Sequence, residues 1–163
     1  MSTHRALLIT VSVLTSAACN AFRHDPAVQV TAKDVSLNSR WHANLASPAS
    51  LAGAVQMNGS ASMAPGSNGT STNITLNIAN ATPGGLHPWE AHFGQCGTGM
   101  DNGVFGATAA YQPLKVEPNG QANATATVSL ETPKVGSYFV VVRASSANSE
   151  TIVACGNLAP PTQ

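Results

Sequence analysis

Charge is the property that this sequence has least of. Only 9% of its 163 residues are Asp, Glu, Lys or Arg, and seven basic residues are balanced by seven acidic ones. A chain without a basic surface lacks the electrostatic footprint of a nucleic-acid-binding protein, and one without an acidic block is no cation buffer. We therefore expect no nucleic-acid partner.

Aromatic residues are also scarce, at 5% of the chain. A hydrophobic core must therefore be built from Val, Ile, Leu and Ala. The length is that of about one domain. The abundance of Gly, Ser, Thr and Asn is typical of an extracellular β-protein with many turns.

After the N-terminal apolar segment, the sequence contains no apolar run long enough to span a membrane. Residues 6–14 follow Arg5 and have the length of a signal-peptide core, too short to span a bilayer. Small residues then lead directly to Cys19, an arrangement that resembles a bacterial lipobox, although Ser16 stands where a lipobox usually has Leu. The resemblance implies that Cys19 is lipidated and holds the protein at a membrane.

Simple cleavage after Ala18 is the alternative to lipidation. Either way we expect a signal peptide at 1–18 and export of the mature chain, with residues 19–40 as a tether. With the lipid, the protein is a bacterial membrane-anchored lipoprotein of the periplasm, outer membrane or cell surface.

Cysteines are few and odd in number. If Cys19 carries a lipid, Cys96 and Cys155 remain, and an oxidising compartment lets them form a disulfide. No CxxC spacing exists to suggest a cysteine-based metal site.

The rest of the chain has the pattern of short β-strands. Thr72 to Ile78 alternates apolar and polar residues, and Ser137 to Arg143 is the most strongly β-forming run and is predicted as a central strand. Turn-forming clusters separate such segments every 8 to 12 residues. We predict an all-β Greek-key β-sandwich or flattened barrel of seven to eight antiparallel strands over residues 41–158, with a tail at 159–163.

One stretch, Leu86 to Cys96 (LHPWEAHFGQC), concentrates the chemically versatile residues. It resembles a segment of the copper/zinc superoxide dismutase family, in which a strand with two copper-binding histidines precedes a loop carrying a disulfide cysteine. Val140 to Arg143 resembles the late strand of that family, which ends in a third copper-binding histidine. Ala154-Cys155-Gly156 resembles its last motif. The resemblance implies the predicted fold and a Cys96–Cys155 disulfide.

The metal ligands of that family are mostly missing here. His92 matches one copper ligand, but Glu90 and Arg143 stand at two others, and residues 97–113 contain no histidine. We therefore predict that Glu90 and Arg143 form an ion pair in the vacated copper position. His87 is expected to bond backbone near Pro88, and Trp89 to pack rather than to serve as a ligand platform.

These losses favour an exported, non-catalytic protein with a binding or structural role, whose protein or small-molecule ligand the sequence does not identify. No cofactor is then expected. The alternative is a metal-binding or redox protein that holds copper or zinc at a divergent site around His87 and His92.

Overall fold

The computed structural model describes residues 40–51, 53–54, 56–97 and 103–162. The predicted signal peptide, Cys19 and all of the tether except Arg40 lie outside the described residues. No helix among the described residues is both long and apolar enough to cross a membrane.

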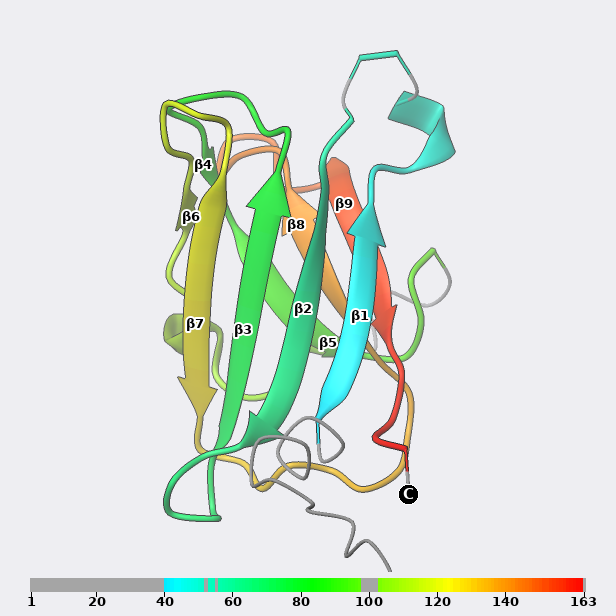
Figure 1. The fold of residues 1–163 in the computed structure, drawn as a ribbon, viewed down its shortest axis with the longest axis vertical. Helices are drawn as coiled ribbons and strands as arrows, with labels where there is room; N and C mark the ends of the chain where they lie inside the picture. The colour runs from blue at the N-terminus through cyan, green and yellow to red at the C-terminus, as the bar shows by residue number, and fades with distance from the viewer. Residues whose placement is uncertain (1–39, 52, 55, 98–102, 163) are drawn as a thin grey trace, which may run out of the picture. The chain divides into compact units, whose positions relative to one another are not determined.

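The described residues form an all-β fold, as predicted (Figure 1). The strands are β1 (Trp41–Ala46), β2 (Asn58–Pro65), β3 (Thr72–Ala79), β4 (Leu86–His87), β5 (Trp89–Phe93), β6 (Leu114–Lys115), β7 (Ala122–Val128), β8 (Tyr138–Arg143) and β9 (Ile152–Leu158). Two single 3₁₀ turns, η1 (Ala49–Leu51) and η2 (Thr108–Ala110), complete the regular structure.

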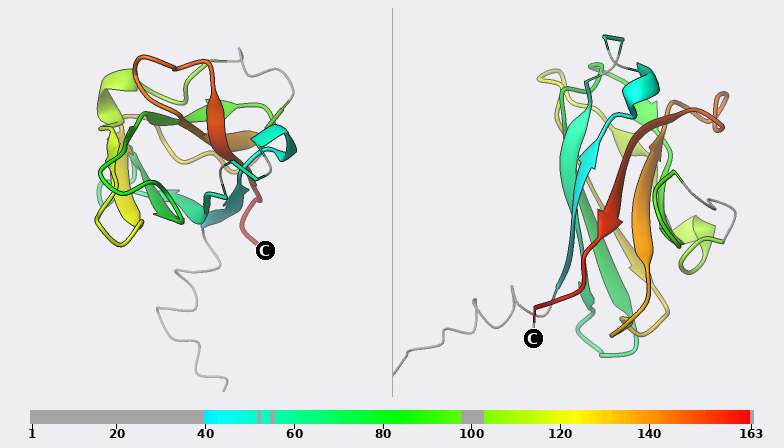
Figure 2. Two further views of the ribbon diagram at one scale, coloured as in Figure 1. Left: turned by 90° about the horizontal axis from the view of Figure 1, so that it is seen from above. Right: turned by 90° about the vertical axis from the view of Figure 1, so that its right-hand side faces the viewer.

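Seven strands make one curled antiparallel sheet in the order β5-β8-β9-β1-β2-β3-β7, and β4 pairs with β6 in a small second sheet. Figure 2 shows the curl, with β1, β2, β3 and β7 on one side and β5, β8 and β9 on the other. Because β3 neighbours β7 and β5 neighbours β8, the connections cross over as in a Greek key.

Alternation of apolar and polar residues explains most of these strands. In β3, Ile74, Leu76 and Ile78 are buried, and the residues between them are Asn and Thr. β8 is buried on both faces from Tyr138 to Val142, which confirms it as a central strand. The core is thus assembled mainly from aliphatic side chains, as the composition predicts.

Three strand assignments differ from the sequence-based expectation. Trp41–Ala46, expected only to open the domain, is itself strand β1, and its Trp41, Ala43 and Leu45 face the core. Conversely, the segment from Leu51 to Met63 becomes strand only from Asn58. The expected single strand from Leu86 to Phe93 is divided at Pro88, which has no N–H to donate to a neighbouring strand.

A narrow seam between β1 and β9 joins the two sides of the curled sheet. Ala46 pairs with Cys155 there, and His42 pairs with Ala159 in the predicted tail. Gly156 allows this approach, because a Cβ atom at that position would lie 2.3 Å from the backbone oxygen of Asn44. A glycine is required here by proximity rather than by its backbone angles.

The outward side of β1, β2, β3 and β7 carries no formal charge. These four strands contain no Asp, Glu, Lys or Arg, and their outward side chains are mainly Asn, Ser and Thr. Cross-strand rows such as Asn44, Ser60, Asn77 and Asn123 result from the pairing register. The few charged groups of the described residues therefore lie on β5, β6, β8 and the connections.

Candidate functional site

The candidate site is the outer face of β5 and β8, which we define by Glu90, His92, Phe139, Val141 and Arg143. In the register of these strands, His92 lies opposite Phe139 and Glu90 lies opposite Val141. The next strand, β9, continues the two rows with Asn157 and Cys155. Since side chains alternate along a strand, these residues share the face turned away from the main core.

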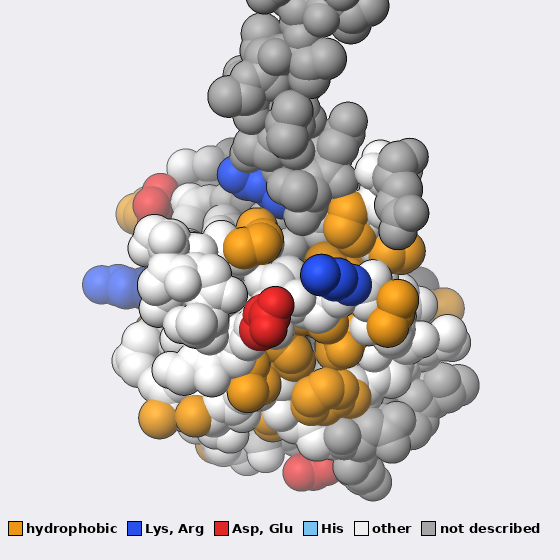
Figure 3. Space-filling view, turned by 90° about the horizontal axis from the view of Figure 1, so that it is seen from below, with side chains coloured by type: hydrophobic (Ala, Val, Ile, Leu, Met, Phe, Trp, Pro, Cys, Tyr) orange, Lys and Arg blue, Asp and Glu red, His pale blue; other side chains and the backbone are white. Residues whose placement is uncertain are grey.

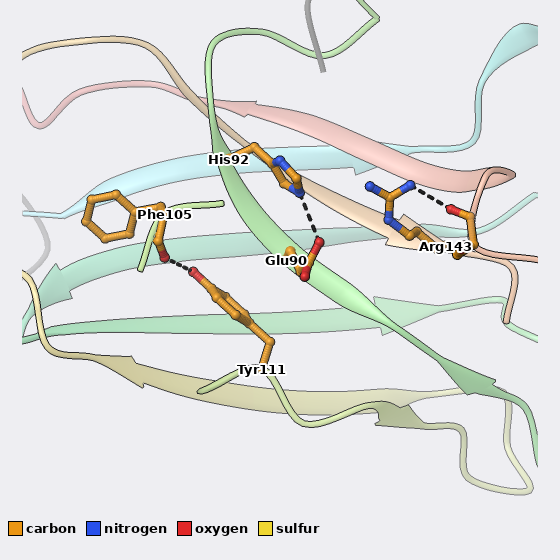
Figure 4. Close-up of polar contacts among 6 residues, drawn as sticks. Glu90, His92, Phe105, Tyr111 and Arg143 are labelled. Carbon is orange, nitrogen blue, oxygen red and sulfur yellow. Dashed lines mark hydrogen bonds and ion pairs between the residues drawn. The ribbon is translucent and has the colours of Figure 1, made fainter. Parts of the chain in front are cut away.

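Glu90 and His92 are in direct contact on this face (Figure 4). The Nε2 atom of His92 lies 3.1 Å from Oε2 of Glu90, with side-chain exposures of 6% and 17% respectively. The His92 ring also stacks on Phe139, with centroids 5.3 Å apart. Because a carboxylate only accepts, Nε2 carries the hydrogen, and Nδ1 has no hydrogen-bond partner within the described residues.

The predicted Glu90–Arg143 ion pair is not formed. The guanidinium of Arg143 instead donates from Nη1 to the backbone oxygen of Ser149, at 2.6 Å, and Glu90 pairs with His92 (Figure 4). Glu90 and His92 are two residues apart on one strand and point to one side. Arg143 ends β8 at a shift in its register with β9, and its side chain serves the connection that follows.

His87 lies on β4 of the small second sheet, whereas His92 lies on β5 of the seven-stranded sheet. Its Nδ1 is 3.0 Å from the backbone oxygen of Arg143, so Nδ1 is the protonated nitrogen and donates. This confirms the expectation that His87 bonds to backbone. Its buried Nε2 has no partner within the described residues. The two candidate metal-binding histidines are thus not brought together.

The Cys96–Cys155 disulfide is formed, as predicted, and borders the site. The two Cα atoms are 6.1 Å apart, and the bond closes a sequence separation of 59 residues. A second tie reinforces it, since the backbone N–H of Cys96 donates to Oδ1 of Asn157 at 2.7 Å. The loop that leaves β5 is therefore fastened to β9 by a covalent bond and a hydrogen bond.

The described part of the connection after Cys96 packs along the free edge of β5. Val104 forms an antiparallel bridge with His92, and the N–H of Phe105 donates to the backbone oxygen of Ala91. The hydroxyl of Tyr111 donates to the backbone oxygen of Phe105 at 2.6 Å. Burial raises the pKa of Tyr111 above its ordinary value, which keeps this hydroxyl protonated as a donor.

The described residues do not fit an imidazole cage for copper. This face offers one imidazole, that of His92, and its Nε2 is hydrogen-bonded to Glu90, the side chain at the neighbouring expected ligand position. No group of three or more His, Cys, Asp or Glu side chains within the described residues is placed to hold a metal ion. The third expected ligand position carries the cation of Arg143.

The structure adds residues that the sequence reasoning did not single out. Asn157 holds Cys96, and Tyr111 holds Phe105. Asn157 could have been found, because it lies two residues after Cys155 and so shares its face of the strand. Tyr111 carried no comparable signal, since its partner is a backbone oxygen in an irregular segment.

Comparison with known proteins yields no match to this chain, either among protein-family models or among curated proteins.

The pairing on this face can be tested with double-mutant cycles. We expect the Glu90→Ala and His92→Ala substitutions to be coupled by about 1 kcal/mol in the free energy of unfolding, because each removes the other's hydrogen-bond partner. Glu90→Ala and Arg143→Ala should be additive within about 0.5 kcal/mol. Chemical denaturation of the single and double variants provides the measurement. A larger coupling energy between Glu90→Ala and Arg143→Ala would instead support the Glu90–Arg143 ion pair expected from the sequence.

Proposed function

We propose that this chain is an exported bacterial lipoprotein, anchored through a lipid on Cys19, whose β-domain is a non-catalytic relative of copper/zinc superoxide dismutase. Its role is binding or structural, at the periplasmic or outer surface of a membrane. The proposal combines the targeting pattern at the N-terminus with the all-β Greek-key fold and its disulfide.

One observation carries the non-catalytic part of the proposal. At the two neighbouring positions where the resemblance expects copper ligands, Glu90 and His92 bond to each other, 3.1 Å apart. At the third position Arg143 bonds to the backbone of the β8–β9 connection. Dismutation requires a copper ion that changes oxidation state within a stable ligand set, and a single imidazole does not supply one.

Metal analysis of the protein purified from its native compartment tests this proposal. We expect far less than one copper or zinc ion per chain and no dismutase activity. Stoichiometric copper together with dismutase activity that is lost in His92→Ala would overturn it in favour of the alternative, a redox protein with a divergent site around His87 and His92. Phe139→Leu, which alters the stacking partner of His92 and no candidate ligand, is the matched control.

Fractionation of the same cells tests the anchor. The wild-type chain should be found with the membranes and carry a fatty-acid label, and Cys19→Ser should lose both properties. An unlabelled wild-type chain in the soluble fraction would support cleavage after Ala18 without lipidation.

A further inference from the structure

An apolar groove lies at the end of the β-domain where β1 begins. Its volume is about 740 Å³. The side chains that give it its apolar character are Trp41, Pro65, Pro133, Val135, Pro160 and Pro161. We call it the tether-side groove, because Arg40, the first described residue, precedes β1 at this end (Figure 1).

The connection between β7 and β8 presents unusual apolar exposure beside this groove. Val135 is 80% exposed and Leu130 is 41% exposed, and they are two of the four large hydrophobic side chains exposed among the described residues. Figure 3 shows hydrophobic side chains gathered at this end around a few charged groups. Exposed apolar clusters of this kind mark surfaces that meet another apolar phase.

Hydrogen-bonding groups are few in the groove. Four of its residues are prolines, which have no backbone N–H, and the indole N–H of Trp41 already donates to the oxygen of Pro133 at 2.8 Å. Covering this surface therefore leaves few donors unsatisfied. The same lack of N–H groups makes it a poor partner for an added peptide strand, which needs a ladder of donors and acceptors.

The charges at this end suit a lipid headgroup layer. Lys134 and Glu131 line the groove, and Arg40 immediately precedes β1, so two of the three are cations. The outward side of β1, β2, β3 and β7, by contrast, has no charged residue and no comparable apolar cluster. Cations beside an apolar patch are the features that hold proteins at anionic bilayer surfaces.

We propose that the tether-side groove and Val135 lie against the surface of the bilayer in which the lipid of Cys19 is inserted. This inference rests on the proposed anchorage. Residues 20–39 span at most about 70 Å, so the anchor holds this end of the domain near the membrane. A tethered contact forms at a high effective concentration, so even a surface of modest apolar area is occupied.

An environment-sensitive fluorophore at position 135 tests this docking. In the full-length lipidated chain, the sulfur of Cys19 carries the lipid and Cys96 is bonded to Cys155, so the Cys introduced by Val135→Cys is the only free thiol. In vesicles of phosphatidylethanolamine and phosphatidylglycerol, we expect its fluorescence to rise about twofold or more and to be quenched by lipids that carry a nitroxide. The matched control is Thr82→Cys, an exposed position in the connection after β3, at the opposite end of the sheet.

Flotation of the same vesicles separates the two hypotheses. Vesicles that float without the protein would contradict lipid anchorage, and with it this inference. Protein that floats while position 135 responds no more than position 82 would contradict the docking alone. A signal at position 135 that also disappears when Lys134→Glu and Arg40→Glu are introduced would support the role of the cations.

Discussion

Replacing both Cys96 and Cys155 by Ala is expected to lower the free energy of unfolding by about 4 kcal/mol. The bond closes a separation of 59 residues, and a chain-entropy treatment of a loop of that length gives this value. A domain of this size has a total stability of roughly 5–15 kcal/mol, so the loss is a large fraction of it. The disulfide connects the start of the loop after β5 to β9, next to the β1–β9 seam.

Chemical denaturation with and without a reductant provides the measurement. Reducing the wild-type protein should produce the same loss as the double substitution. Asn157→Ala is the control, because it removes the hydrogen bond to the N–H of Cys96 but leaves the covalent bond, and should cost about 1 kcal/mol. A loss below about 1 kcal/mol in the double variant would show that the native contacts alone hold this loop.

The strands could be predicted where the pattern of side chains repeats every two residues. β3 and β8 are examples, since the first alternates cleanly and the second is continuously apolar. β1 was missed, although Trp41, Ala43 and Leu45 alternate with polar residues. The strand has only six residues, and few turn-forming residues precede it to mark where it begins. The break at Pro88 follows from proline chemistry, and only the pairing of β4 with β6 shows where each half goes.

The site was harder to predict than the fold, because a resemblance locates positions on a strand but not the partners of long side chains. Glu90 and Arg143, on the neighbouring strands β5 and β8, were expected to face each other at one position. Which of them would pair depends on where each side chain ends, and Arg143 is long enough to reach Ser149 instead. The disulfide was predictable because the expected export favours disulfides and, with Cys19 assigned to the lipid, the count of cysteines leaves one pairing.

The scarcity of aromatic residues is offset by their placement. All seven aromatic residues outside the N-terminal 39 are described, and each makes at least one ring contact. Trp41, Tyr138, Phe105 and Phe93 form one connected group, and Trp89 contacts Tyr111. Aromatic pairs in edge-on geometry contribute beyond their buried area, so a few such residues can fix the irregular segment after β5.

Trp89→Ala is expected to be among the most destabilising single substitutions, with a loss of about 3–5 kcal/mol. The side chain is 1% exposed, its N–H donates to the backbone oxygen of Gln112 at 2.8 Å, and its ring meets that of Tyr111 edge-on at 5.1 Å. The substitution removes core volume and leaves the oxygen of Gln112 without its donor. It also releases Tyr111, whose hydroxyl holds Phe105 against β5.

Trp41 remains as the fluorescent reporter of unfolding in this variant, so the same denaturation experiment applies. Phe93→Ala is the matched control, because Phe93 lies on the same strand but is 38% exposed, and it should cost about 1 kcal/mol. Trp89→Phe should fall between the two, since a ring is retained but the hydrogen bond is lost. Equal losses for Trp89→Ala and Phe93→Ala would mean that the connection after Cys96 is held by the disulfide rather than by Trp89.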